Sequence, residues 1–125
     1  MTPSMLIGLA LAGAIGAPCR YLLDGIVQDR TSGIVPYGTL VVNVTGSLVL
    51  GLITGAVLYH GFPDEPKLWL GTGFCGSFTT FSTFAFETVR LVEERAIVAA
   101  IVNVGASVLL GTAAAAAGLA IAAAL

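Results

Sequence analysis

Charged residues are scarce in this chain and are missing from long stretches of it. Asp, Glu, Lys and Arg make up 10% of its 125 residues, whereas soluble domains contain about 25%. None of these four types occurs in residues 1–19, 37–59, 68–86 or 96–125. A helix needs ~20 apolar residues to cross the hydrocarbon core of a membrane, and a soluble helix gains nothing from an apolar surface all round. The pattern therefore argues against a soluble domain and predicts an all-α integral membrane protein.

Features that would indicate other classes of protein are also missing. The two cysteines, Cys19 and Cys75, are too few for a disulfide framework and are typical of small apolar packing residues. No basic cluster suggests a nucleic-acid partner. The hydrophobic stretches hold no carboxylate pair, metal-ligand cluster or activated nucleophile, so we expect no enzyme activity. No Lys or Arg precedes the first apolar run, which favours a retained span over a signal peptide.

The hydrophobic stretches predict one transmembrane domain over residues 1–125. We expect four spans, at about residues 5–27, 36–59, 68–92 and 96–124. The loop between the second and third spans holds two prolines and three charges, which indicates a clear break. Small residues such as Gly51 and Gly55 recur at four-residue spacing, which lets helices approach closely in lipid. The loops on the two sides differ little in basic residues, so insertion in both orientations is possible.

The middle of the third span is the most informative segment. Residues 71–84, GTGFCGSFTTFSTF, are rich in glycine, hydroxyl and aromatic side chains, and glycine and threonine are modest helix formers. A broken helix at membrane depth is tolerated only where its freed backbone groups face protein, water or an ion, and such breaks mark ion sites. A continuous helix whose hydroxyls bond to their own backbone is the alternative. Composition alone leaves both open.

Three phenylalanines of this segment, Phe78, Phe81 and Phe84, are spaced three apart and should fall on one side of a helix. Such a stripe usually packs in a core or against lipid. The positively polarised edge of an aromatic ring can also contact an anion, whereas its face repels one. Aromatic edges could therefore line a pore for a small anion, provided that hydrogen-bond donors stand beside them.

Candidate donors lie inside the other spans. A carboxamide such as that of Asn43 is costly in a membrane unless it is partnered, and polar residues inside spans are functional candidates by default. Interhelical hydrogen bonding that only fixes packing is the alternative. Arg20 could extend to the interface or attract anions. The remaining donors are the Asn103 and Ser107 pair, one turn apart on one face, and the hydroxyls of Ser82 and Thr83.

Arg20, Asn43, Ser82 and Thr83 fall within three motifs that resemble those of the Fluc (CrcB) fluoride channels. Residues 13–21, GAIGAPCRY, resemble the family's G-x-x-G-A-x-x-R-Y, and residues 38–46, GTLVVNVTG, resemble its G-T-L-x-x-N-x-x-G. Residues 73–84 resemble G-x-x-G-x-x-T-T-F-S-T-F, which is the most specific of the three. Their order and spacing, the chain length and the four spans agree with the family over essentially the whole chain.

The resemblance implies a homodimer in the cell membrane, whose two subunits insert antiparallel and enclose two separate fluoride pores. It also implies that the third helix is broken at the dimer centre. There a structural sodium ion would be held by the backbone carbonyls of Gly76 and Thr79 from both subunits. Partners would thus be fluoride, sodium, the lipid bilayer and a second copy of the chain.

The resemblance further assigns roles to individual residues. Phe81 and Phe84 match the pore phenylalanines that present ring edges to fluoride. Other matches are Asn43 of the second helix, the path-lining hydroxyls Ser82, Thr83 and Ser107, Arg20 near a pore mouth, and Glu87 in a vestibule. At position 103 the family often has Tyr, so Asn103 keeps a donor in the polar track but departs from the pattern.

Taken together, these features predict a channel that exports fluoride passively and so relieves fluoride toxicity. Fluoride is small and strongly hydrated, so its passage needs donors that replace its water shell. The alternative is a small dual-topology exporter of the multidrug-resistance type. Such an exporter needs a membrane-embedded acid, and this chain has none before Asp24, near the end of the first span. A non-transporting scaffold subunit would not need the polar residues of the spans.

Overall fold

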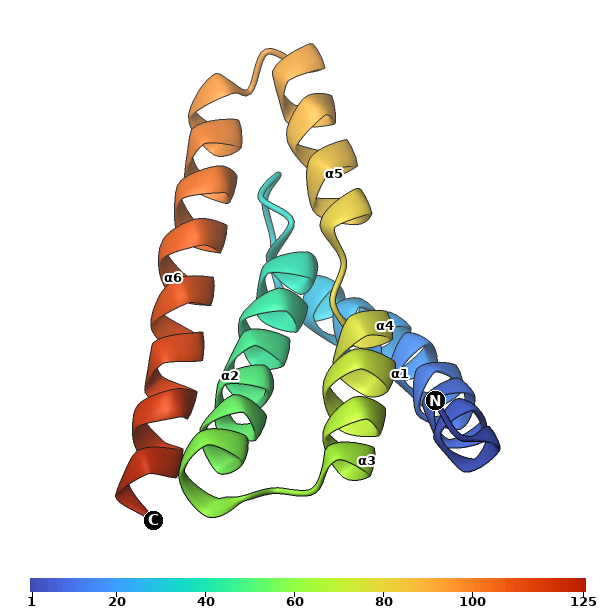
Figure 1. The fold of residues 1–125 in the computed structure, drawn as a ribbon. Helices are drawn as coiled ribbons and strands as arrows, with labels where there is room; N and C mark the ends of the chain where they lie inside the picture. Colours follow the sequence, from blue (N-terminus) through green and yellow to red (C-terminus); the bar gives the residue numbers. More distant parts are fainter.

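Figure 1 shows the computed structural model of the protein, which describes all 125 residues. The chain is helical throughout and contains no β-strand. In order, its elements are α1 (Pro3–Arg30), α2 (Tyr37–His60), α3 (Asp64–Lys67), the π-helical segment η1 (Leu68–Cys75), α4 (Gly76–Phe78), α5 (Phe81–Glu93) and α6 (Ile97–Ala124).

Three of these helices, α1, α2 and α6, are long and apolar enough to cross a membrane. The fourth predicted span is divided among α3, η1, α4 and α5. Large apolar side chains stay exposed on the protomer, including Leu109 (71%) and Val98 (76%) on α6. A surface of this kind is stable against lipid or another subunit rather than against water. The structure is therefore that of a multi-pass membrane protein with three intact spans and one broken span.

A short helix precedes residue 68, where the third span is predicted to begin. Helix α3 starts at Asp64, inside the segment expected to be a loop, and Pro66 lies in its first turn. Proline is tolerated there because the first amides of a helix have no intrahelical partner. Pro66 therefore lies at the start of a helix and does not end one.

Helices α2 and α6 lie side by side along most of their length (Figure 1). Glycine makes this close approach possible. A Cβ atom added at Gly51 would collide with the backbone of Ala115, and one added at Gly118 would collide with the backbone of Leu48 and Leu52. The predicted use of small residues for tight helix packing is thus confirmed at this interface.

On the other side, α1 packs against η1 and α4, away from α6 (Figure 1). A Cβ atom at Gly16 would collide with Ser77 and with the Phe74 carbonyl. Near the start of α1, the indole nitrogen of Trp69 donates to the Met5 carbonyl at 3.2 Å. These contacts fix the first half of the broken span on α1.

The second half of the broken span, α5, is joined to α6 by a short turn in which Arg95 adopts a left-handed conformation (φ 60°). Next to this turn, Leu91, Ala99 and Ala100 form a small apolar core. Away from the turn the two helices diverge (Figure 1). The two halves of the broken span therefore rest on different helices, and the space between them becomes the candidate site.

Candidate functional site

The break in the third span lies at two threonines. Helix α4 ends at Phe78, and Thr79 (φ −77°, ψ 160°) and Thr80 (φ −148°, ψ 123°) are extended before α5 begins at Phe81. The amide of Thr80 donates to Asn43 Oδ1 at 2.8 Å, so it does not reach the carbonyl of Gly76, its partner in a continuous helix. Of the two alternatives that the composition leaves open, the broken helix is the one observed.

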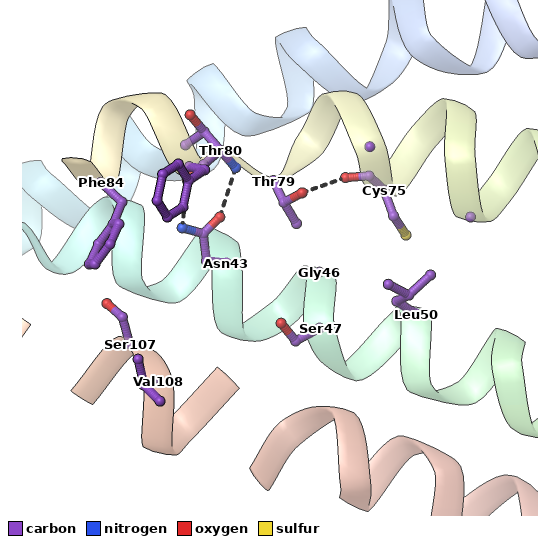
Figure 2. Close-up of a pocket in the computed structure, with 13 residues that line it drawn as sticks. Asn43, Gly46, Ser47, Leu50, Cys75, Thr79, Thr80, Phe84, Ser107 and Val108 are labelled. Atoms are coloured by element: carbon purple, nitrogen blue, oxygen red, sulfur yellow. Dashed lines mark hydrogen bonds between the residues drawn. The ribbon is translucent and has the colours of Figure 1, made fainter. Parts of the chain in front are cut away.

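Asn43 of α2 supplies both hydrogen bonds that the broken backbone needs at Thr80 (Figure 2). Its Nδ2 donates to the Thr80 carbonyl at 2.9 Å, while its Oδ1 accepts from the Thr80 amide. The Thr80 hydroxyl in turn caps α5 by accepting from the amide of Thr83 at 3.1 Å. Since a carboxamide has two N–H donors, Asn43 keeps one that is not used by Thr80.

A groove of about 390 Å³ runs along the break between α2, the two halves of the third span and α6 (Figure 2). Six predicted residues line it: Asn43, Gly76, Thr79, Phe81, Phe84 and Ser107. Ser107 of α6 faces Phe84 of α5, and Ser47 lies one turn along α2 from Asn43 (Figure 2). Ser47 and Cys75 also line the groove, and sequence reasoning did not select either of them.

The phenylalanines divide into two groups at the break. The rings of Phe81 and Phe84 are 5.7 Å apart and tilted by 49°, and Phe81 is 79% exposed on the protomer. Phe78 is buried and stacks on Phe74 at 5.5 Å. The expected stripe of three is therefore wrong for Phe78, because the extended residues that follow it rotate the chain.

A second cavity of about 200 Å³ lies on the α1 side of the break. Seven residues line it: Arg20, Tyr21, Asp24, Thr39, Val42, Thr80 and Thr83. Arg20 reaches the break itself, because its Nη1 donates to the Thr79 carbonyl at 3.4 Å. Thr80 lines this cavity as well as the groove. Arg20 and Thr83 therefore stand across the broken backbone from the phenylalanines.

Glu87 is held farther along α5. Its Oε1 accepts from the Thr39 hydroxyl at 3.0 Å, and its Oε2 is buried without a hydrogen-bond partner. It lines a third cavity of about 210 Å³ together with Gln28, Arg90 and residues near them. Sequence reasoning did not single out Thr39, although it belongs to the second motif.

Two other predicted residues lie away from the groove. Asn103 is 1% exposed, and its Nδ2 donates to the hydroxyl of Thr88 at 2.9 Å. Ser107, one turn along α6, lines the groove, but Asn103 does not. Ser82 is exposed on α5 and is likewise not part of the groove. Their participation in a conduction path remains a prediction.

The oxygen atoms at the break suit a hard cation. No group of three or more His, Cys, Asp and Glu side chains is arranged to hold a metal ion. The Thr80 amide, which would bond to the Gly76 carbonyl in a continuous helix, donates to Asn43 instead. The Thr79 carbonyl accepts one long hydrogen bond from Arg20. A carbonyl oxygen has two lone pairs, and backbone carbonyls can replace the hydration shell of an alkali ion. Both carbonyls therefore retain capacity for a sodium ion.

Comparison with known proteins identifies close relatives. A family model described as "CrcB-like protein, Camphor Resistance (CrcB)" matches residues 7–119. "Fluoride-specific ion channel FluC 1" of Streptomyces avermitilis is 50% identical over 111 residues, covering 88% of this chain and 90% of the relative. "Fluoride-specific ion channel FluC 2" of Mycobacterium tuberculosis is 46% identical over 115 residues, covering 92% and 88%. "Fluoride-specific ion channel FluC 1" of Frankia casuarinae is 47% identical over 120 residues, covering 91% and 93%.

Proposed function

Because this chain belongs to the CrcB family, we propose that it is a fluoride-selective ion channel that exports fluoride passively across the cell membrane. It is a multi-pass membrane protein of a channel family, not an enzyme. The relatives named for fluoride support the ion, and they do not favour a multidrug exporter. Passive export would lower the fluoride concentration inside the cell and relieve its toxicity.

The groove at the break is the observation that carries this proposal. Fluoride gives up its water only to donors that replace it. The spare N–H of Asn43, the Ser107 hydroxyl and the first amides of α5 are such donors, and the positive end of a helix dipole favours an anion. The ring edges of Phe81 and Phe84 add weakly positive contacts beside them.

We propose that two copies of the chain insert antiparallel and enclose two pores. In one protomer the groove is open along its length and the Phe81 ring is exposed. An open groove facing lipid would offer an ion no second wall. A second subunit would cover Phe81 and complete the lining. The weak charge bias of the loops supports insertion in both orientations.

We further propose that a sodium ion lies at the centre of this dimer. The carbonyls of Gly76 and Thr79 from both subunits would hold it and supply an oxygen-only shell. Bound there, the ion would attract the negative ends of the carbonyl dipoles and tie the broken segments together. A high-resolution structure of the dimer should show compact density with oxygen ligands at this position. Density with nitrogen or sulfur ligands, or none, would contradict the sodium proposal.

The other predicted residues would shape the route to and from the groove. Arg20 places positive charge beside the break and would attract anions into the second cavity, where the Thr83 hydroxyl lies. Glu87 would border a vestibule, and Ser82 and Asn103 would add polar groups near the path. These roles follow the family pattern at matching positions.

Flux measurements on purified protein test the function. Liposomes loaded with fluoride should release it when a potassium ionophore removes the charge barrier, and chloride should leave much more slowly. No proton gradient should be needed, because no acid in the groove is available for coupling. Equal fluoride and chloride flux, or efflux that requires an imposed proton gradient, would contradict the proposal.

A further inference from the structure

We infer that Thr88 and Asn103 are positioning residues, which set the distance between Phe84 and the opposite wall of the groove. The inference rests on the proposed function, since it concerns the fluoride pore. It gives Asn103 a role different from that of a pore-lining donor. Its basis is a chain of two hydrogen bonds that links α6 to the backbone of Phe84.

The Thr88 hydroxyl is the centre of this chain. It donates to the Phe84 carbonyl at 2.8 Å and accepts from Asn103 Nδ2 at 2.9 Å. Thr54 makes the same bond to the carbonyl four residues earlier, but it is exposed and its hydroxyl forms no hydrogen bond with a second helix. The Thr88 hydroxyl thus forms the local bond to Phe84 and also links α5 to α6 through Asn103.

Burial makes the interhelical bond obligatory. Asn103 is 1% exposed, and Val42 is the one other large side chain that is as fully enclosed. A carboxamide in this position has no water to bond with, so separating it from Thr88 would leave a buried donor unpaired. The two helices should therefore keep their spacing at this level.

The position of the bond along α5 and α6 lets it set the spacing of the two helices where the groove begins. The helices are joined at their turn, pack through Leu91, Ala99 and Ala100, and then diverge (Figure 1). The Asn103–Thr88 bond lies one turn before the level at which Phe84 and Ser107 face each other across the groove (Figure 2). It is the last polar contact between α5 and α6 before the groove opens.

Loss of this bond would let α5 move away from α6 and carry the Phe84 ring with it. Fluoride selectivity depends on how closely donors and ring edges surround a desolvated ion. A wider groove would hold fluoride less well and admit larger, less hydrated anions. The expected effect is therefore on selectivity, beyond any loss of stability.

Four variants separate positioning from simple stabilisation. Thr88→Val keeps the shape and removes the hydroxyl, Thr88→Ser keeps the hydroxyl, and Asn103→Leu removes the interhelical donor. Thr54→Val is the matched control, because it deletes the same local bond at an exposed site away from the groove. Fluoride and chloride efflux from liposomes are measured per assembled dimer, with thermal unfolding measured on the same samples.

Thr88→Val and Asn103→Leu should each lower the fluoride-to-chloride flux ratio by about tenfold, less than the roughly 100-fold that a ~1 Å misplacement costs at a positioned enzyme site. The double variant should be no worse than either single one, because both remove the same bond. Thr88→Ser and Thr54→Val should retain the wild-type ratio. If Asn103→Leu does not assemble, the comparison of Thr88→Val with Thr88→Ser decides alone.

Two results would overturn the inference. One is a wild-type flux ratio in assembled Thr88→Val, even with a lower unfolding temperature, since the bond would then be structural only. The other is a fluoride-to-chloride flux ratio that falls as far in Thr88→Ser as in Thr88→Val, since loss of the hydroxyl would then not explain the fall. Absence of fluoride flux from the wild-type protein would instead contradict the proposed function, and is seen before any variant is compared.

Discussion

The α2–α6 interface and the break in the third span are held together in different ways. Along α2 and α6, glycines let the backbones meet, and His60 is the one side chain that bonds across, with its Nε2 2.7 Å from the Ala122 carbonyl. Asn43 and Arg20 form polar contacts with the third span at the break, and Thr39 forms one farther along α5. Close packing thus makes α2 and α6 a rigid wall of the groove. Side-chain hydrogen bonds are concentrated where the backbone is irregular and an ion would pass.

The largest effect should come from forcing the rigid wall apart. Gly51→Ala combined with Gly118→Ala places Cβ atoms against facing backbone, which cannot move aside as a side chain can. Overpacking costs about 1–3 kcal/mol at each site, so little assembled protein should survive purification. Gly25→Ala is the control, since no atom lies within 4 Å of the added Cβ within the protomer. Equal yields by gel filtration would show that α2 and α6 are not closely packed.

Asn43→Asp should abolish transport while the proposed dimer still assembles. The carboxylate keeps the bond from the Thr80 amide but cannot donate to the Thr80 carbonyl, and it adds an acceptor-only charge to the groove. An anion would be repelled, and the break would lose one of its two supports. Thr45→Val, which alters only a local bond on the same helix, should conduct normally. Substantial fluoride efflux in Asn43→Asp would move the pore away from this residue.

The smallest effect should follow from removing the one polar contact of the rigid wall. His60→Phe deletes the bond to the Ala122 carbonyl and should cost about 0.5–1.5 kcal/mol of stability. Fluoride flux per dimer should be unchanged, because His60 lies at the far end of α2 from the groove. A large loss of flux with an unchanged unfolding temperature would show that the wall and the break are not separate in function.

The main features of the fold could be predicted from the sequence because the membrane imposes them. Charge-free stretches predicted membrane-spanning helices. The glycine and hydroxyl content of residues 71–84 left a broken and a continuous helix open, and only the family resemblance implied the break that the structure places at Thr79 and Thr80. The loop predicted between the second and third spans is shorter than expected, because Pro66 was taken to mark a loop but lies in the first turn of α3.

The partners of the polar side chains could not be predicted, since they depend on how each helix is rotated about its axis. Asn43 was predicted to be a functional hydrogen-bond donor inside its span. Its two hydrogen bonds to Thr80 could not be predicted, because they depend on the extended backbone at that residue. Asn103 and Ser107 are one turn apart, yet only Ser107 reaches the groove because Asn103 is paired with Thr88. Helical spacing gives a shared face and leaves open what that face contacts.

On the proposed function, fluoride passes along the groove beside the ring edges of Phe81 and Phe84. Phe81→Ile and Phe84→Ile nearly conserve volume, so each should cost less than about 1.5 kcal/mol of stability. Both replacements remove the polarised ring edge. The decisive measurement is fluoride efflux per dimer from liposomes, after gel filtration has confirmed assembly. We expect rapid efflux through the wild-type protein and a steep fall in both variants. Full flux in both variants would place the fluoride path elsewhere and leave the phenylalanines as packing residues.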